Sequence, residues 1–287
     1  MNTLQKMRHL RQNIMSFKRN DVQEFIEYEL KCFNLNNWLS YKTKLLAWEV
    51  SRSNENQLER CIKSDLHAYF FKALQTFIQS LHDFFQKKYS WSIIKFYYTT
   101  FYLLRCDILL SNHIIIRCGG FYYAKVEIGN KFIQFKKRNI RGDHQMTIAL
   151  AKKLNEDGEI FDPIFGNEIN GDNAYIWLMK NRERINYQTQ DFSDPYADVI
   201  LLHLKSYFQK NKIKDLFEFY NSNVDYSICF DIDHSIIAIP FKKITNIFKK
   251  LETDFYFPDE YKRKYISCIN FTKDLNIRRA HLEELVK

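Results

Sequence analysis

Arg182, Tyr187 and His144 are the side chains of this sequence that are best suited to act on a phosphate group. Arginine stays charged at every physiological pH and can donate two parallel hydrogen bonds to phosphate oxygens. Tyrosine is a poor base at neutral pH because its unperturbed pKa is about 10, although its hydroxyl can still hydrogen-bond a phosphate. Histidine titrates near neutrality, so His144 is the candidate proton acceptor. The three residues predict anion binding, with acid–base chemistry if His144 lies close to Arg182.

Two of these residues also have a purely structural interpretation. His144 is expected at the start of a helix, where the positive end of the helix dipole favours the neutral imidazole. The alternative is that His144 caps that helix or faces solvent. Arg182 and the neighbouring Arg184 could instead hydrogen-bond carboxylates such as Asp107 and only stabilise the fold.

Four further polar side chains complete the predicted site as substrate-binding residues. Arg105 and Asp107 stand inside an otherwise apolar helix, where a charged side chain needs a partner. Arg184 and Asn186 lie between Arg182 and Tyr187, in a second helical segment, Asn173–Tyr187. An ion pair from Arg105 or Asp107 to that second segment is the structural alternative.

Two helical segments are expected to position these residues, Tyr89–Asn112 and Asn173–Tyr187. An amphipathic helix from about Ser64 to Lys88 precedes the first segment, with a short corner between them. Two long helices with a short joint should form an antiparallel hairpin. The polar stretch Ser51–Asn56 reads as a connector before this hairpin.

The two segments together resemble the paired core helices of a HEPN domain, a small all-α module that in many bacterial toxins and defence proteins cuts RNA without a metal. The family motif is an arginine, four to six residues, and then a histidine. Arg182 matches the arginine, and Tyr187 stands in the place of the histidine, as in a HEPN branch that reads R-x-x-x-D/N-Y. That branch also carries an aromatic-rich helix, like Tyr97–Phe101 here, and a histidine that opens the next helix, like His144. The resemblance covers roughly Ser64–Lys210.

The resemblance implies a four- or five-helix antiparallel bundle that dimerises, so that two copies of the motif face one another. It also implies an RNA-directed effector of a bacterial anti-phage defence or toxin–antitoxin system. Such an effector would cleave RNA at a dimeric site without a metal or cofactor. Arg182 would stabilise the phosphate charge, with Tyr187 and His144 assisting.

Two other functions remain open. A HEPN-fold subunit that has lost catalysis would bind RNA, a nucleotide or a protein within a defence complex, and the tyrosine at position 187 favours this reading. An interaction scaffold without a nucleic-acid ligand is the third possibility. RNA cleavage in EDTA discriminates the first function from the other two, and RNA affinity discriminates the second from the third.

The remaining segments predict a mainly α fold with two additions. Residues 1–56 are expected to be a helical N-terminal extension, and residues 57–211 the HEPN-like bundle. Within the bundle, the period of apolar residues changes over residues 113–138, which predicts a small antiparallel β insertion of at most three strands. Residues 212–287 are expected to form an α+β extension, with strands at Tyr226–Phe230 and Ser235–Ile239 before a basic helix.

Composition sets broad limits on the function. The 43 Lys and Arg outnumber the 34 Asp and Glu, which gives a net charge of +9 that suits an RNA partner without requiring one. The six cysteines show no CxxC and are expected to be reduced thiols. The N-terminus lacks a signal-peptide pattern, and no apolar stretch is long enough to span a bilayer, so we expect a cytoplasmic protein.

Several clusters of polar residues are weaker candidates. The trio Asp231, Asp233 and His234 resembles a metal site only superficially, because no further carboxylates surround it. Two basic clusters could follow a nucleic-acid backbone, although solvated surfaces are the commoner explanation. They are Lys136, Lys137, Arg138 and Arg141, and Lys242, Lys243, Lys249 and Lys250, with Lys262, Arg263 and Lys264 beyond.

Overall fold

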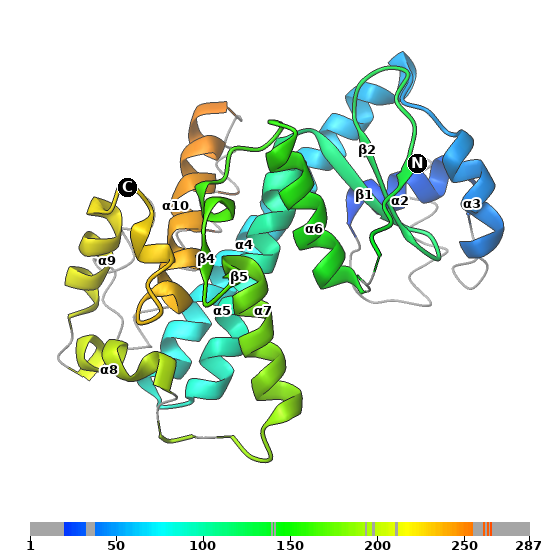
Figure 1. Cartoon of the computed structure of the whole chain (residues 1–287). Coiled ribbons are helices and arrows are strands. Elements are labelled where there is room, and N and C mark those ends of the chain that lie inside the picture. Colours follow the sequence, from blue (N-terminus) through cyan, green and yellow to red (C-terminus); the bar gives the residue numbers. More distant parts are fainter. Residues whose placement is uncertain are drawn as a thin grey trace. The chain divides into compact units, whose positions relative to one another are not determined.

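The chain folds into two compact units in a computed structural model (Figure 1). The structure describes residues 20–32, 38–138, 140, 142–192, 194–196, 199–209, 212–254, 261, 263 and 265. The first unit contains the described residues up to Asp65 together with Ile114–Gln134. The second contains Leu66–His113 and the described residues from Phe135 onward. The domain boundaries predicted near residues 56 and 211 stay predictions.

The first unit combines helices with a small sheet. Its elements are α2 (Asp21–Glu29), α3 (Trp38–Ala47), the N-terminal part of α4 (Arg52–Phe85), and strands β1 (His113–Arg117), β2 (Phe121–Lys125) and β3 (Ile133–Gln134). The strands lie in the order β1-β2-β3, and β2 pairs with β3 in antiparallel register. The β insertion predicted for this part of the chain is therefore confirmed. Residues 1–19 of the predicted helical N-terminal extension lie outside the described residues.

Side-chain caps explain where two of these helices begin. The buried carboxylate of Asp65 accepts hydrogen bonds from the backbone N–H groups of Asp21 and Val22, at 2.7 and 3.0 Å, and so satisfies free donors at the start of α2. At the start of α4, the backbone N–H of Ser51 donates to the Asn54 side chain at 2.8 Å. The polar stretch predicted as a connector is therefore a helix start. That prediction was wrong because capping residues and loop residues have the same composition.

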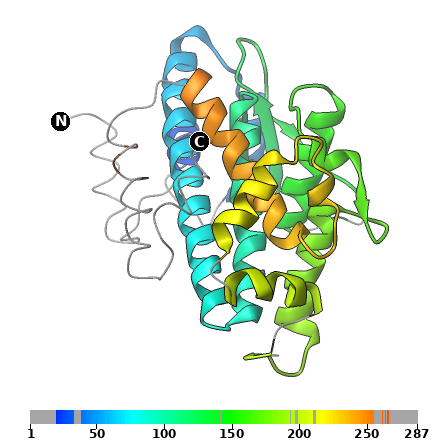
Figure 2. The same cartoon turned by 90° about the vertical axis from the view of Figure 1, so that its left-hand side faces the viewer.

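Helix α5 (Tyr89–Leu110) is the central element of the second unit. It packs against α6 (Asp143–Glu156), α7 (Ala174–Glu183) and α10 (Ser235–Asp254), as Figures 1 and 2 show. The C-terminal part of α4 also contacts it, through the edge-to-face pair of Phe77 and Phe96 and the hydrogen bond from the Ser92 hydroxyl to the Ser80 carbonyl. Because neighbours cover it on several sides, α5 is apolar over most of its length.

The segment between α6 and α7 is not wholly irregular. It contains a 3₁₀ turn (Pro163–Gly166) and the two-residue antiparallel strands β4 (Glu168–Ile169) and β5 (Asp172–Asn173). The Asn173 side chain accepts a hydrogen bond from the Tyr175 N–H at 3.1 Å and caps α7. A π-helical turn (Arg184–Gln188) follows α7 directly.

The last described elements are helical, which corrects the α+β prediction for the C-terminal extension. They are 3₁₀ turns at Val199–Leu201 and Ser227–Cys229, α8 (Leu202–Gln209), α9 (Ile213–Ser222) and α10. The run predicted as a strand at Ser235–Ile239 is the start of α10, and the backbone N–H of Ser235 donates to the Asp231 carbonyl at 2.7 Å. Its apolar side chains are completely buried. A short apolar run that is buried all round has the same pattern in a strand and in a helix, so periodicity could not separate the two.

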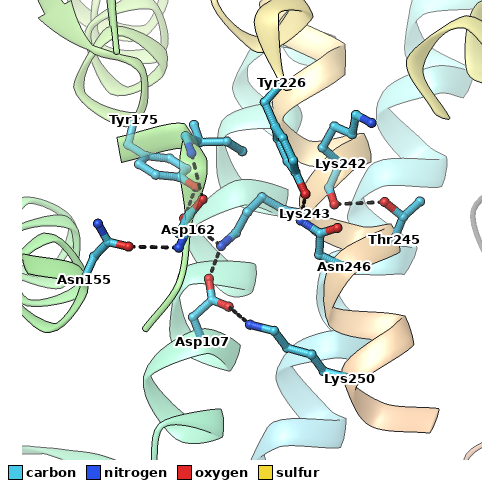
Figure 3. Close-up of polar contacts among 11 residues, drawn as sticks. Asp107, Asn155, Asp162, Tyr175, Tyr226, Lys242, Lys243, Thr245, Asn246 and Lys250 are labelled. Carbon is cyan, nitrogen blue, oxygen red and sulfur yellow. Dashed lines mark hydrogen bonds and ion pairs between the residues drawn. The ribbon is translucent and has the colours of Figure 1, made fainter. Parts of the chain in front are cut away.

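A buried group of charges connects α10 to α5 and to the segment before the 3₁₀ turn at Pro163 (Figure 3). The Lys243 ammonium donates to the carboxylate of Asp107 on α5 and, at 2.9 Å, to the carboxylate of Asp162. All three side chains are almost inaccessible to solvent. Asp162 also accepts hydrogen bonds from the Tyr175 hydroxyl and from the Ile164 N–H. We call Asp107, Asp162 and Lys243 the buried charge network.

Burial makes this network sensitive to the loss of any member. It lowers the pKa of Lys243 well below the ordinary lysine value and raises the pKa of Asp162 to about 6. The Tyr175 hydrogen bond opposes the second shift. A buried charge without its partner is costly, so each member depends on the others to stay ionised.

The described chain is mainly helical with a small antiparallel sheet, which confirms the predicted fold class in these two respects. None of its described helices carries an apolar stretch long enough to cross a bilayer.

Replacing Lys243 with methionine should strongly destabilise the second unit. The substitution preserves much of the side-chain volume but removes the cation that two buried carboxylates share. The half-buried Lys250, 3.9 Å from Asp107, compensates this loss only in part, so the cost is about 3–5 kcal/mol. Urea unfolding measures the free energy of unfolding. Lys180→Met is the matched control, because Lys180 forms a solvent-exposed pair with Asp172 and should cost less than about 1 kcal/mol. Equal effects of the two substitutions would show that the network has no special role in stability.

Candidate anion-binding site

Three tyrosine rings surround the Arg182 guanidinium near the end of α7. Its central carbon lies 5.8, 5.5 and 5.5 Å from the ring centroids of Tyr97, Tyr98 and Tyr187. Its Nη2 donates a hydrogen bond to the Tyr98 hydroxyl at 3.0 Å. Such contacts with ring faces stabilise the cation without neutralising it. Arg182 is half-buried, so part of the guanidinium remains accessible.

Arg182 is not committed to an internal acid. Within the described part of the chain, no ion pair joins it to a carboxylate, and tyrosines are the neighbours that act on its pKa. Its Nε is buried without a hydrogen-bond partner. A cation that is only partly satisfied by neutral groups is suited to bind an anion. The structure therefore differs from the alternative in which Arg182 pairs with Asp107.

The π-helical turn determines which residue covers Arg182. In an α-helix, residues five apart are rotated by about 140°, so Tyr187 would face away from Arg182. The π-helical turn Arg184–Gln188 changes this rotation directly after α7, and the Tyr187 ring lies 5.5 Å from the Arg182 guanidinium. Tyr187 is 73% exposed, so it covers Arg182 from the solvent side.

His144 lies on the other side of Tyr97 and Tyr98. It is the second residue of α6, as expected for a residue near a helix start. Its Nδ1 is 2.7 Å from the Tyr97 hydroxyl, and its ring packs on Phe101 with centroids 4.3 Å apart. Burial lowers its pKa from the ordinary value, and the Arg182 charge lowers it further. His144 is therefore held as a neutral imidazole close enough to Arg182 to be affected by its charge.

The hydrogen bond with Tyr97 limits the protonation state of His144. Tyr97 is almost completely buried, and burial raises its pKa, so its hydroxyl stays protonated. If that hydroxyl donates to Nδ1, the imidazole proton is on Nε2, which is then a donor. If Nδ1 carries the proton and donates to Tyr97, Nε2 is free to accept one. The tautomer with the proton on Nε2 is suited to bind an anion, and the tautomer with the proton on Nδ1 is suited to act as a base.

Arg105 holds the start of α6 through an ion pair with Asp143. It is buried, and its Nη2 donates to the Asp143 carboxylate at 2.7 Å. Asp143 is the first residue of α6, so this ion pair holds the helix start that carries His144. The guanidinium of Arg105 also stacks over Phe101, at 5.5 Å. The prediction that Arg105 pairs with the second helical segment was wrong, because its partner lies on α6.

The other predicted substrate-binding residues do not contact Arg182 or His144 in the interactions described above. Asp107 is buried and pairs with Lys243 on α10, not with the second helical segment as expected. We therefore leave it out of the site. Arg184 and Asn186 are half-buried members of the π-helical turn that presents Tyr187.

The weaker candidates are dispersed. Lys136, Lys137 and Arg138 are exposed, whereas Lys242 and Lys243 are buried, so the second basic cluster is not a single exposed surface. Arg141, Lys262 and Lys264 lie outside the described residues. Asp231, Asp233 and His234 belong to no cluster of potential metal ligands within the described part of the chain.

The sequence-based set of site residues lacked Tyr97, Tyr98 and Asp143. Tyr97 and Tyr98 stand in the aromatic stretch that supports the family resemblance, and that was the available signal. Which of its rings would face Arg182 depends on the rotation of α5 and could not be derived from spacing. We call Tyr97, Tyr98, His144, Arg182 and Tyr187 the tyrosine-lined site.

Comparisons of the chain with protein-family models, with curated proteins and with solved structures found no match.

The pKa of His144 should respond to the charge of Arg182. Burial and the Arg182 cation place this pKa below the ordinary value of 6.5. Arg182→Gln should raise it toward 6.5, as measured by NMR titration of the imidazole signals. Below about pH 6.5, His144 binds a proton in the unfolded chain but not yet in the folded protein. The free energy of unfolding therefore falls as the pH falls through this range. The same substitution should reduce that loss. Arg184→Gln is the matched control, and an equal shift in that variant would contradict the assignment.

Proposed function

We propose that this chain is an RNA-directed effector with a HEPN-like core, which binds RNA phosphate at the tyrosine-lined site and cleaves RNA without a metal ion. The observation that supports this most is the environment of Arg182. Its accessible guanidinium has tyrosines instead of carboxylates as partners, and a neutral histidine lies beside the same two rings. This arrangement supplies a phosphate-binding cation and a candidate base.

In the proposed reaction, Arg182 donates hydrogen bonds to the non-bridging oxygens of the scissile phosphate. Nε2 of His144, in the tautomer whose Nδ1–H donates to Tyr97, takes the proton of the ribose 2′-hydroxyl. The 2′-oxygen forms a bond to phosphorus, and the bond from phosphorus to the 5′-oxygen breaks. The 5′-oxygen takes a proton from water. The products are a 2′,3′-cyclic phosphate and a 5′-hydroxyl, with the histidine returning its proton to solvent.

The second candidate function is RNA binding without cleavage, and the Tyr97–His144 contact favours it. Tyr97 is almost completely buried, so a hydroxyl that accepts from His144 would leave its own proton unpaired there, which is costly. The tautomer in which Tyr97 donates avoids that cost and makes Nε2 a donor to phosphate. Tyr187, which stands where the family has histidine, also favours binding.

The wider context of the proposal comes from the family resemblance. It includes a homodimer in which two tyrosine-lined sites face one another, or a place in a larger complex. It also includes a role in anti-phage defence or in a toxin–antitoxin pair. The exposed position of Tyr187 is compatible with a second protomer completing the site.

RNA cleavage in EDTA tests the proposed activity. The purified protein is incubated with a mixed RNA pool, and the 2′,3′-cyclic phosphate ends are measured. Arg182→Ala should reduce the rate at least about 100-fold, because the substitution removes the group that stabilises the phosphate charge. His144→Ala should reduce it by a similar factor. Lys214→Ala, which removes an exposed cation of α9, is the matched control and should leave the rate unchanged.

The outcomes separate the two candidates. RNA binding that depends on Arg182, with no cleavage by the wild-type protein, would replace the first function with the second. Cleavage that persists in Arg182→Ala, or a wild-type protein that neither binds nor cleaves RNA at low salt, would contradict both.

A further inference from the structure

A row of tyrosine rings leads from the tyrosine-lined site across α5 to α4. The rings of Tyr98 and Tyr102 have centroids 6.4 Å apart, and Tyr102 lies 6.4 Å from Tyr69 of α4. Both pairs are tilted by 32°. Tyr98 in turn contacts Arg182. We call Tyr69, Tyr102 and Tyr98 the tyrosine row.

A cation lies at each end of the row. The Lys72 ammonium is 5.6 Å from the centroid of Tyr69, and the Arg182 guanidinium is 5.5 Å from that of Tyr98. Lys72 is exposed, and Arg182 is half-buried. The row is thus three consecutive aromatic rings with a positive charge at each end, which complements a polyanion that carries flat apolar groups.

Packing between α4 and α5 does not require these three rings. The contact is filled by completely buried side chains such as Phe77 and Phe96, which meet edge to face. Tyr69 and Tyr102 meet at the edge of that contact, and all three tyrosines of the row stay half-exposed. Tyr98 and Tyr102 are four residues apart on α5, so they share one face of the helix. Tyr98 and Tyr102 therefore present their accessible surface on one side of α5.

We infer that the tyrosine row is a base-stacking subsite for the RNA strand whose phosphate binds Arg182, an inference that rests on the proposed function. Unpaired bases stack on tyrosine rings, whereas a duplex hides the faces of its bases. The phosphates of the same strand meet Arg182 at one end and Lys72 at the other. The row is long enough for about four nucleotides, the lower end of the range for single-strand sites.

Two fluorescent probes of different length test this subsite. One is a dinucleotide that reaches only the tyrosine-lined site, and the other is a single strand of about eight nucleotides. Both carry 2′-O-methyl groups, which prevent cleavage. Fluorescence anisotropy at low salt gives the dissociation constants.

Substitutions in the row should weaken binding of the long probe alone. Tyr102→Leu and Tyr69→Leu should each raise its dissociation constant about tenfold and leave that of the dinucleotide unchanged. Tyr102→Trp keeps a stacking ring and should retain the wild-type affinity, which distinguishes stacking from a folding defect. Phe161→Leu is the matched control, because Phe161 is 83% exposed and lies outside the row.

The outcomes separate this inference from the proposed function. If the long probe binds Tyr102→Leu and the wild-type protein equally well, while Arg182→Ala weakens both probes, the subsite is refuted and the proposed function stands. A duplex that binds as tightly as the single strand would also refute the subsite. If neither probe binds the wild-type protein, both proposals fail.

Discussion

The ammonium group of Lys243 is the constraint on which the second unit depends. It lies between the carboxylates of Asp107 and Asp162 and is almost inaccessible to solvent, so it fixes α10, α5 and the segment before α7 against one another (Figure 3). Tyr175 of α7 hydrogen-bonds the same Asp162. Removal of this cation would leave two buried carboxylates with only the more distant charge of Lys250, which is 3.9 Å from Asp107, and this cost makes other arrangements of the three elements unfavourable. A buried ion pair gains little free energy over well-packed apolar side chains, so the network matters chiefly through the cost of losing one member.

Helix α5, which Asp107 ties to Lys243, also carries two rings of the tyrosine-lined site. Tyr97 and Tyr98 lie on α5, His144 opens α6, and Arg182 ends α7. Each of these helices packs against α5, so the side chains meet because α5 is central. A second, smaller ion pair, between Arg105 and Asp143, holds the start of α6 in place. The buried charge network and the Arg105–Asp143 pair thus support an arginine outside them that has no acidic partner in the described chain. Such an arrangement leaves one cation available to a ligand.

The sequence predicted the elements with strong periodicity and missed what depends on tertiary contacts. Helices α5 and α6 and the β insertion were recognised from apolar spacing and turn residues. The start of α10 was assigned as a strand, because a short run such as Ile236–Ile239 that is buried all round carries no period. Lys243 was expected on a solvated surface, since nothing local shows that Asp107 and Asp162 meet it. The contact of Tyr187 with Arg182 depends on a π-helical turn, which the residue pattern does not encode.

A crystal structure of the protein with a short RNA strand that carries 2′-O-methyl groups tests the central claim most directly. The account predicts a phosphate with its oxygens within hydrogen-bond distance of the Arg182 guanidinium, between His144 and Tyr187. A structure in which the strand binds elsewhere, while Arg182 keeps only its contacts with the tyrosine rings, would contradict it.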